Sequence, residues 1–151
     1  MDAKMSSKMP EIRFQGFAEE WERTTLGELT TYKNGKGHED RQAAQGRYEL
    51  INLNSISITG VLKSSGKYID ETEETLNKDD LVMILSDVAH GNLLGRVARI
   101  PEDDRYVLNQ RVAQLRPVNS KYATYLAYRI CLLYTSPSPR DQRGSRMPSS
   151  A

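Results

Sequence analysis

A run of five apolar residues, 81–85, gives the clearest strand signal in the chain. An apolar run without a polar break is typical of a strand that is covered on both faces. Residues 96–100 mix two arginines with apolar side chains and residues 111–115 alternate, so both predict half-buried strands. The acidic turn at 101–104 joins them. We therefore expect three strands that meander around the loop at 88–92.

A capping box marks the first predicted helix. Thr25 and Glu28 have its spacing, in which the hydroxyl accepts a backbone N–H and the carboxylate reaches back to the cap. We expect this helix to run to about Lys33 and to end at a left-handed Asn-Gly stop, residues 34–35. A polar, glycine-rich loop at 34–41 follows, which is the kind of exposed segment that carries function.

The remaining pattern predicts short elements of both kinds. Residues 47–53 and 67–69 are predicted strands, and residues 70–77 begin with a second N-terminal helix signal. Asn119 or Ser120 can cap a third helix, in which apolar residues recur at helical spacing. These elements predict one α+β domain with a twisted, mostly antiparallel β-sheet and short helices, followed by the start of a long helix.

The sequence also indicates domain boundaries. We expect a disordered leader at 1–9, the domain at 10–118, and the beginning of the long helix at 119–130. The aromatic residues Phe14, Phe17 and Trp21 are expected to form an arm that packs on the domain. Nearby glutamates argue against the alternative, in which the arm stacks on bases.

The composition changes after Ile130, where prolines and serines become frequent. Residues 131–151 resemble the translation of a sequencing-library adapter. That resemblance implies an artefactual, disordered tail and a natural protein that continues past about residue 130.

Length and composition bound the class of protein. A chain of 151 residues with 38% hydrophobic and 27% charged residues can bury one core. No apolar run is long enough for a membrane span and no signal-peptide core begins the chain, so we expect no membrane contact and a cytoplasmic location. With one cysteine and two histidines, the sequence predicts neither an internal disulfide nor a metal site.

Charge is balanced overall and segregated locally. The formal net charge is +1, and without residues 131–151 the basic residues fall from 21 to 18 and the acidic ones from 20 to 19. Non-specific nucleic-acid binding proteins are far more basic. Residues 33–47, however, carry four basic against two acidic side chains, whereas residues 70–80 hold six acids and one lysine. One side of the molecule is therefore expected to be electropositive.

Catalytic chemistry is not evident. Ser86, Asp87 and His90 lie too close along one loop to suggest a triad, and no nucleophile-elbow glycines surround the serine. The glycines at 35 and 37 lack the spacing of a phosphate loop. The carboxylate pairs at 79–80 and 103–104 are expected to be solvated. The sequence thus favours a recognition module over an enzyme.

Several motifs resemble, in order, those of one family. They are Pro10–Phe14 with Gly16-Phe17, Trp21, Leu26-Gly27-Glu28, Lys33–Gly37, Asp80–Met83, Gly95–Ala98, Leu108–Val112 and Leu115-Arg116-Pro117. Together, over about residues 9–130, they resemble the first target-recognition domain of a type I restriction-modification specificity subunit, here truncated.

This resemblance implies a function and partners. Such subunits carry two target-recognition domains separated by long helices, and each domain reads one half of a split DNA sequence. The helices dock methylation subunits, which bind S-adenosylmethionine and flip the target adenine. ATP and Mg belong to the partner subunits as well, so this chain would need no cofactor. Its partners would be double-stranded DNA and the methylation and restriction subunits.

Candidate DNA contacts fall into two groups. Basic side chains would bind phosphates, and amides, hydroxyls and a forked arginine would read bases. The candidate phosphate contacts are Lys33, Lys36, Arg41 and Arg47, with Asn34 and His38 beside them in the loop. The candidate base contacts are Asn52, Asn54, Ser55, His90, Asn92 and Arg111. Each has a structural alternative, such as Asn as a turn former at the end of a strand.

Two other functions remain open. The chain is alternatively a β-rich protein-interaction module, with the tyrosine-bearing third helix and the Trp21 arm as contact surfaces. A small hydrolase centred on Ser86 and His90 is a third possibility. Duplex binding that weakens steeply with salt separates the first two, and loss of turnover on Ser86→Ala identifies the third.

Overall fold

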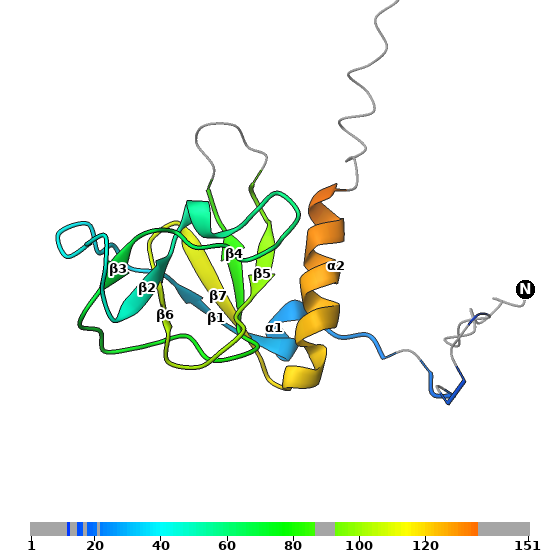
Figure 1. The fold of residues 1–151 in the computed structure, drawn as a ribbon. Coiled ribbons are helices and arrows are strands. Elements are labelled where there is room, and N and C mark those ends of the chain that lie inside the picture. Colours follow the sequence, from blue (N-terminus) through cyan, green and yellow to red (C-terminus); the bar gives the residue numbers. More distant parts are fainter. Residues whose placement is uncertain (1–11, 13–14, 17, 21, 87–92, 136–151) are drawn as a thin grey trace, which may run out of the picture.

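The computed structural model describes residues 12, 15–16, 18–20, 22–86 and 93–135, the last four by their backbone alone. These residues form three layers: a C-terminal helix, a four-stranded sheet and a three-stranded sheet (Figure 1). The aromatic arm residues Phe14, Phe17 and Trp21, and the predicted loop at 88–92, lie outside the described residues.

The larger sheet has the order β1 (Thr30–Asn34), β7 (Val112–Pro117), β4 (Leu81–Ile84) and β5 (Val97–Arg99), and all its pairs are antiparallel. β4 is central, and the prediction of a strand covered on both faces is confirmed. The predicted meander is wrong, because β7 pairs with β4 on the side away from β5. β7 is also more buried than predicted: Val112 to Leu115 are all buried, since layers cover both faces of the sheet.

The smaller sheet has the order β3 (Tyr68–Ile69), β2 (Tyr48–Ile51) and β6 (Tyr106–Leu108). β2 and β3 are antiparallel and β2 and β6 are parallel. The turn at 101–104 therefore leads into β6 of the second sheet and not directly to β7. Two short sheets and a few short helices confirm the predicted α+β domain with mostly antiparallel pairing.

Two apolar cores hold the layers together. Val82, Ile84, Val112 and Ile100 belong to the core that includes Ile51 of the smaller sheet. On the other face of the larger sheet, apolar side chains of β4, β5 and β7 pack against the C-terminal helix; these are Leu81, Val97 and Leu115 against Ala123, Leu126 and Ile130. The face of the larger sheet that looks toward the smaller sheet also carries the polar cleft described below.

The first helix, α1 (Leu26–Leu29), begins at the predicted capping box. Thr25 Oγ1 accepts a hydrogen bond from Glu28 N at 3.3 Å, and Glu28 Oε2 accepts one from Thr25 N at 2.7 Å. The helix ends at Leu29 and not at about Lys33, because Thr30 already begins β1. The β-branched pair Thr30 and Thr31 favours a strand, and pairing with β7 satisfies the backbone that a longer helix would have used.

The second predicted helix, at 70–77, is absent, and these described residues form an irregular segment. Leu76 N donates to Tyr106 O at 2.8 Å, and Asn77 N donates to the side chain of Asp80. The backbone therefore bonds outward to neighbouring elements instead of within a helix.

The third helix is confirmed. Asn119 caps η2 (Ser120–Tyr122), and α2 (Ala123–Thr135) follows directly. Residues 131–135, which were expected to begin a disordered tail, belong to this helix. Among the described residues no helix is long and apolar enough to cross a membrane.

Candidate functional site

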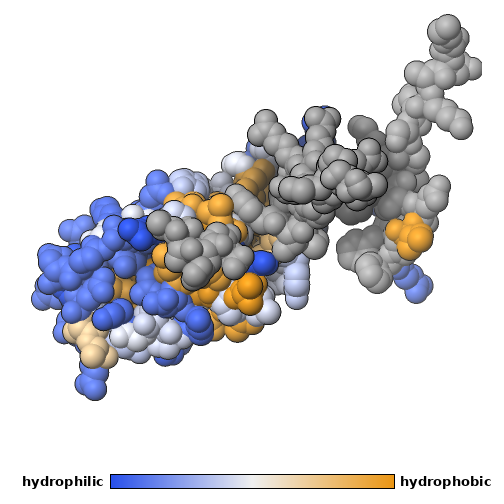
Figure 2. All heavy atoms as spheres, turned by 90° about the horizontal axis from the view of Figure 1, so that it is seen from above, coloured by the Kyte–Doolittle hydropathy of each residue, from blue (hydrophilic) through white to orange (hydrophobic). Residues whose placement is uncertain are grey.

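A polar cleft of about 830 Å³ opens beside β1 and β7. Its walls are β1, the loop that follows β1, the irregular segment 71–77, and parts of β6 and β7. Basic and acidic side chains both line it: Lys33, Lys36, Arg41 and Arg116 face Glu71, Glu73 and Glu74. The space-filling view shows that the end of the molecule bearing the loop after β1 is mainly hydrophilic (Figures 1 and 2).

Strand register explains why these side chains meet. Lys33 pairs with Gln114 and Thr31 pairs with Arg116 across the antiparallel β1–β7 ladder. Directly opposed residues of an antiparallel pair project from the same face of the sheet. Two residues from each strand therefore share one face, and that face lines the cleft.

A buried carboxylate organises the β7 side of the cleft. Asp80 is 1% exposed, and its Oδ1 accepts a hydrogen bond from Arg116 Nε at 2.8 Å. Its Oδ2 accepts from Arg116 Nη2 at 2.9 Å, from Gln114 Nε2 at 2.5 Å and from Asn77 N at 2.8 Å. The expectation that Asp80 is solvated is therefore wrong. The hydrogen bond from Arg116 to Asp80 raises the pKa of the guanidinium, which keeps it cationic.

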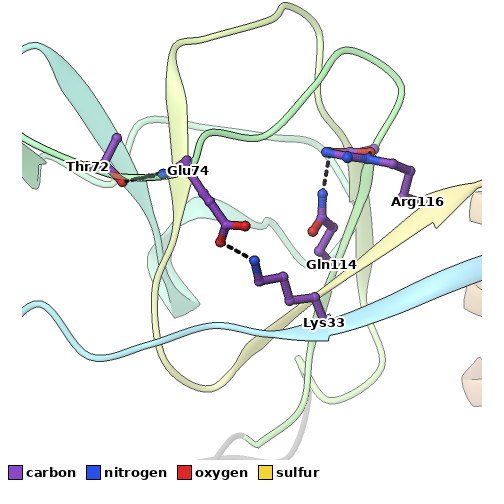
Figure 3. A network of polar contacts seen from close by, with 6 residues as sticks. Lys33, Thr72, Glu74, Gln114 and Arg116 are labelled. Carbon is purple, nitrogen blue, oxygen red and sulfur yellow. Dashed lines mark hydrogen bonds and ion pairs between the residues drawn. The ribbon is translucent and has the colours of Figure 1, made fainter.

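An ion pair crosses the cleft from the other side. Lys33 Nζ contacts Glu74 Oε2 (Figure 3), and both side chains are substantially exposed, at 45% and 64%. The hydrogen bond and charge of Lys33, with smaller contributions from Lys36 and Arg116, lower the pKa of Glu74. The acidic segment thus folds back onto the basic loop. The two charges that are segregated in sequence are interleaved in space, so the prediction of one electropositive side is wrong at this cleft.

The basic loop is anchored to the turn between β6 and β7. Gly35 N donates to Val112 O at 3.0 Å, and His38 Nδ1 lies 3.2 Å from Asn109 Oδ1. His38 and Asn109 are both buried. The side chain of Gln110 donates to Glu39. The loop therefore has a fixed base, on which Lys36 and Arg41 stand at the cleft.

Gly35 is required by close approach and not by a left-handed turn. A Cβ at this position would lie 1.8 Å from Asn109 O, and Gly35 does not have a positive φ. The predicted Asn-Gly helix stop is wrong. Asn34 instead ends β1, and Gly35 brings the chain against the backbone of the β6–β7 turn.

Five predicted site residues line the cleft, and five do not. Those in the cleft are Lys33, Asn34, Lys36, His38 and Arg41. Asn34 Oδ1 also accepts a hydrogen bond from Tyr32 Oη at 2.6 Å. Those outside it are Arg47, Asn52, Asn54, Ser55 and Arg111. His90 and Asn92 lie outside the described residues.

The residues outside the cleft have structural partners or turn positions. The guanidinium of Arg47 lies 5.1 Å from the centre of the Tyr48 ring. Asn52 and Ser55 form a capping box around η1 (Leu53–Ser55), and the Ser55 side chain is fully buried. Arg111 is exposed in the β6–β7 turn with φ 66°. Asn52 is a turn former at the end of a strand, which is the structural alternative to base contact.

Sequence reasoning missed the polar residues of β7 and their carboxylate. Gln114 and Arg116 alternate with apolar Ala113 and Leu115, which places both polar side chains on one strand face. The position of Asp80, immediately before the apolar run 81–85, was the available signal for a buried partner. The pattern does not show which strand lies beside β4, so the contact of Asp80 with Gln114 and Arg116 was not predicted.

Metal chemistry receives no support from the described part of the chain, where no group of three His, Cys, Asp or Glu side chains is arranged to hold an ion. The buried polar side-chain atoms within the described ranges all have hydrogen-bond partners.

Comparison with known proteins gives similarity in structure only. No protein-family model and no curated protein matches the sequence. Among solved structures, a chain from a study of complex assembly and conformational transition of the type I R-M system aligns with TM-score 0.58 and 13% identity, over 73% of this chain and 27% of that one. The HsdS subunit from Thermoanaerobacter tengcongensis aligns with TM-score 0.56 and 12% identity, over 89% of this chain and 34% of that one.

These alignments confirm the fold that the sequence motifs predicted. The described elements share the fold of part of the solved HsdS subunit, and this chain spans about a quarter to a third of the two solved chains.

Proposed function

We propose that this chain is a target-recognition domain of a type I restriction-modification specificity subunit and binds double-stranded DNA sequence-specifically. The shared fold with a solved HsdS subunit is the observation that carries the proposal. The cleft supports it independently, because it places two exposed cations, Lys33 and Arg116, on one sheet face. The chain itself would be non-catalytic and would direct methylation and cleavage by its partners.

Affinity in this proposal comes from phosphate contacts. Lys36 and Arg41 stand on the anchored loop, and Arg116 adds a guanidinium whose orientation is fixed by Asp80. Arginine held in a fixed geometry loses less side-chain entropy on binding phosphate than a free one. Phosphate contacts of this kind orient a protein on the duplex but carry no sequence information.

Base discrimination requires hydrogen-bonding groups near these cations. Asn34 is an exposed amide among the residues that line the cleft, and an amide can form two hydrogen bonds with adenine in the major groove. Gln114 is buried and its Nε2 donates to Asp80, so we give it a structural role. Asn54, Arg111, His90 and Asn92 stay in the proposal as contacts from neighbouring loops. His38 is buried against Asn109, so we assign it the positioning of the loop. Ser55 is fully buried and Arg47 stacks on Tyr48, and we give them structural roles.

Partner subunits complete the proposed assembly. α2 packs Ala123, Leu126 and Ile130 on the larger sheet and leaves Tyr125 and Tyr128 exposed, and Tyr122 of η2 is exposed beside them. We propose that it begins the helix that docks methylation subunits. In this assembly S-adenosylmethionine, ATP and Mg would be bound by the methylation and restriction subunits, and the assembly would act on DNA in the cytoplasm.

A salt titration with a matched control tests DNA binding. A labelled random-sequence duplex is titrated with wild-type protein, with Lys36→Ala/Arg41→Ala, and with Lys63→Ala/Lys67→Ala, which removes the same charge from exposed positions outside the cleft. Each lost phosphate contact reduces the slope of log affinity against log salt by about 0.9. We expect the cleft variant to lose about 2 units of slope and the control to keep the wild-type slope.

Two results would contradict the proposal: no duplex binding at low salt, or equal effects of the two double variants. The exposed tyrosines of α2 favour a second candidate, a β-rich protein-interaction module without DNA binding. That candidate predicts the first of these results.

A further inference from the structure

The Glu74 carboxylate lies where cations from three elements converge. Lys33 from β1 forms an ion pair with it, and Lys36 from the following loop and Arg116 from β7 are close enough to favour its charged form. All four residues line the same cleft, and Lys33 and Glu74 extend toward each other across it (Figure 3). The cations that surround this carboxylate would also surround a DNA phosphate bound at the same place.

Glu74 lies in a segment that is anchored to the body on both sides of it, first by Asp70, whose Oδ1 accepts a hydrogen bond from Arg47 N at 3.1 Å. The backbone N of Glu74 donates to Thr72 Oγ1 at 3.3 Å, and its O accepts from the same hydroxyl at 2.8 Å, so these bonds stay within the segment. The anchors after Glu74 are Thr75, whose Oγ1 donates to Asp104 at 2.8 Å, and Leu76, which is 2% exposed. The Glu74 side chain can therefore leave the cleft by rotation about its own bonds while the body of the domain stays in place.

We propose that Glu74 is an internal phosphate mimic, which occupies a backbone-phosphate position in the free protein and is displaced when a duplex binds. This inference rests on the proposed DNA binding. Carboxylate and phosphate both present anionic oxygens that accept hydrogen bonds from Lys33, and like charges cannot share the position. Lys33 must exchange Glu74 for phosphate as the complex forms.

The exchange makes DNA binding weaker than the cations alone would allow. An exposed ion pair contributes little, about 0.2 to 1 kcal/mol, which corresponds to a factor of roughly 1.5 to 5 in affinity. The anionic Glu74 also disfavours the incoming phosphate until it has moved away. The Lys33–Glu74 ion pair would favour ligands that present several phosphates at once over isolated anions.

The test compares two glutamates of the same cleft. Glu74→Gln removes the mimic, and Glu73→Gln removes the same charge from the neighbouring exposed residue, which also lines the cleft. We measure dissociation constants for a labelled random-sequence duplex by fluorescence anisotropy at fixed salt, on the full chain. Glu74→Gln is expected to tighten binding about two- to fivefold, and clearly more than Glu73→Gln does.

A double-mutant cycle separates displacement from a general charge effect. In a Lys33→Gln background, Glu74 cannot compete with phosphate for the lysine. The extra gain in duplex affinity from Glu74→Gln over Glu73→Gln should therefore disappear. If the wild-type protein binds the duplex and the two variants gain equally in affinity, the inference is overturned and the proposed function stays intact. The same holds if the extra gain in affinity persists without Lys33. Absence of binding by every variant would overturn the proposed function and the inference with it.

Discussion

Arg116 donates two parallel hydrogen bonds to Asp80, although the two side chains differ greatly in exposure: the carboxylate is 2% exposed and the guanidinium 45%. The pair fixes the end of β7 against the residue that precedes β4, and it turns an arginine toward the cleft. Gln114 and Asn77 fill the remaining acceptor positions of the carboxylate. The same contact therefore stabilises the sheet and orients a side chain of the site.

Replacing Arg116 by Met should destabilise the domain strongly. The change leaves the buried Asp80 carboxylate without its counter-ion, and an uncompensated buried charge typically costs about 3 to 5 kcal/mol. Urea unfolding followed by far-ultraviolet circular dichroism measures the loss. Arg105→Met is the control, because its ion pair with Glu102 is exposed on both sides, at 55% and 50%, and should contribute less than about 1 kcal/mol. Similar losses for the two variants would show that the Asp80 carboxylate does not depend on Arg116.

Gly35→Ala should be far more damaging than Gly27→Ala. A Cβ at residue 35 would meet Asn109 O at 1.8 Å and Asn109 C at 2.5 Å, both backbone atoms that cannot rotate away. Such overpacking costs about 1 to 3 kcal/mol or more, and it should separate β1 from the β6–β7 turn. Gly27 lies in α1, and a Cβ added there would have nothing within 4 Å, so alanine should be neutral or stabilise by up to about 1 kcal/mol. Free energies of urea unfolding distinguish the two.

Local signals in the sequence predicted the start of α1 and the position of the central strand β4. The capping box at Thr25 and the apolar run that forms β4 are both where the pattern put them. The end of α1 was misjudged because β7, about 80 residues away in sequence, competes for the backbone of Thr30 to Asn34. The acidic segment 70–77 was misjudged because Leu76 N bonds to Tyr106 O of β6 and Asn77 N bonds to the side chain of Asp80, so neither amide is left for a helix.

The candidate site was predicted only where its residues are adjacent in sequence. Lys33, Lys36 and Arg41 line one cleft because they share one loop and strand. Glu74, Asp80 and Arg116 join them through sheet register, which the alternation of a single strand cannot reveal.

Ser55 and Asn54 are adjacent in sequence, and we expect their alanine variants to differ in kind. Ser55 Oγ accepts from Asn52 N at 2.9 Å and is fully buried, so Ser55→Ala should cost about 1 to 3 kcal/mol in stability and leave duplex affinity unchanged. Asn54 is exposed, and its backbone bond to Asn52 Oδ1 survives truncation of its side chain. Asn54→Ala should leave stability within about 0.5 kcal/mol and weaken duplex binding. Unfolding curves and anisotropy on both variants check this, and a loss of affinity for Ser55→Ala alone would reverse the two roles.

The Glu74 carboxyl should titrate below the ordinary pKa of a glutamate, since Lys33 donates a hydrogen bond to its charged form. A depressed folded-state pKa gives stability that is present above the unfolded-state value and is lost as pH falls through the folded-state value. The ion pair should therefore persist at pH values where other exposed glutamates are already protonated. Carbon-detected NMR of the side-chain carboxyl, followed through an acid titration, measures this directly. In Lys33→Gln the pKa of Glu74 should rise most of the way to its ordinary value, because the remaining cations, Lys36 and Arg116, contribute less. An unchanged pKa in that variant would mean that Lys33 does not hold the carboxylate in the cleft.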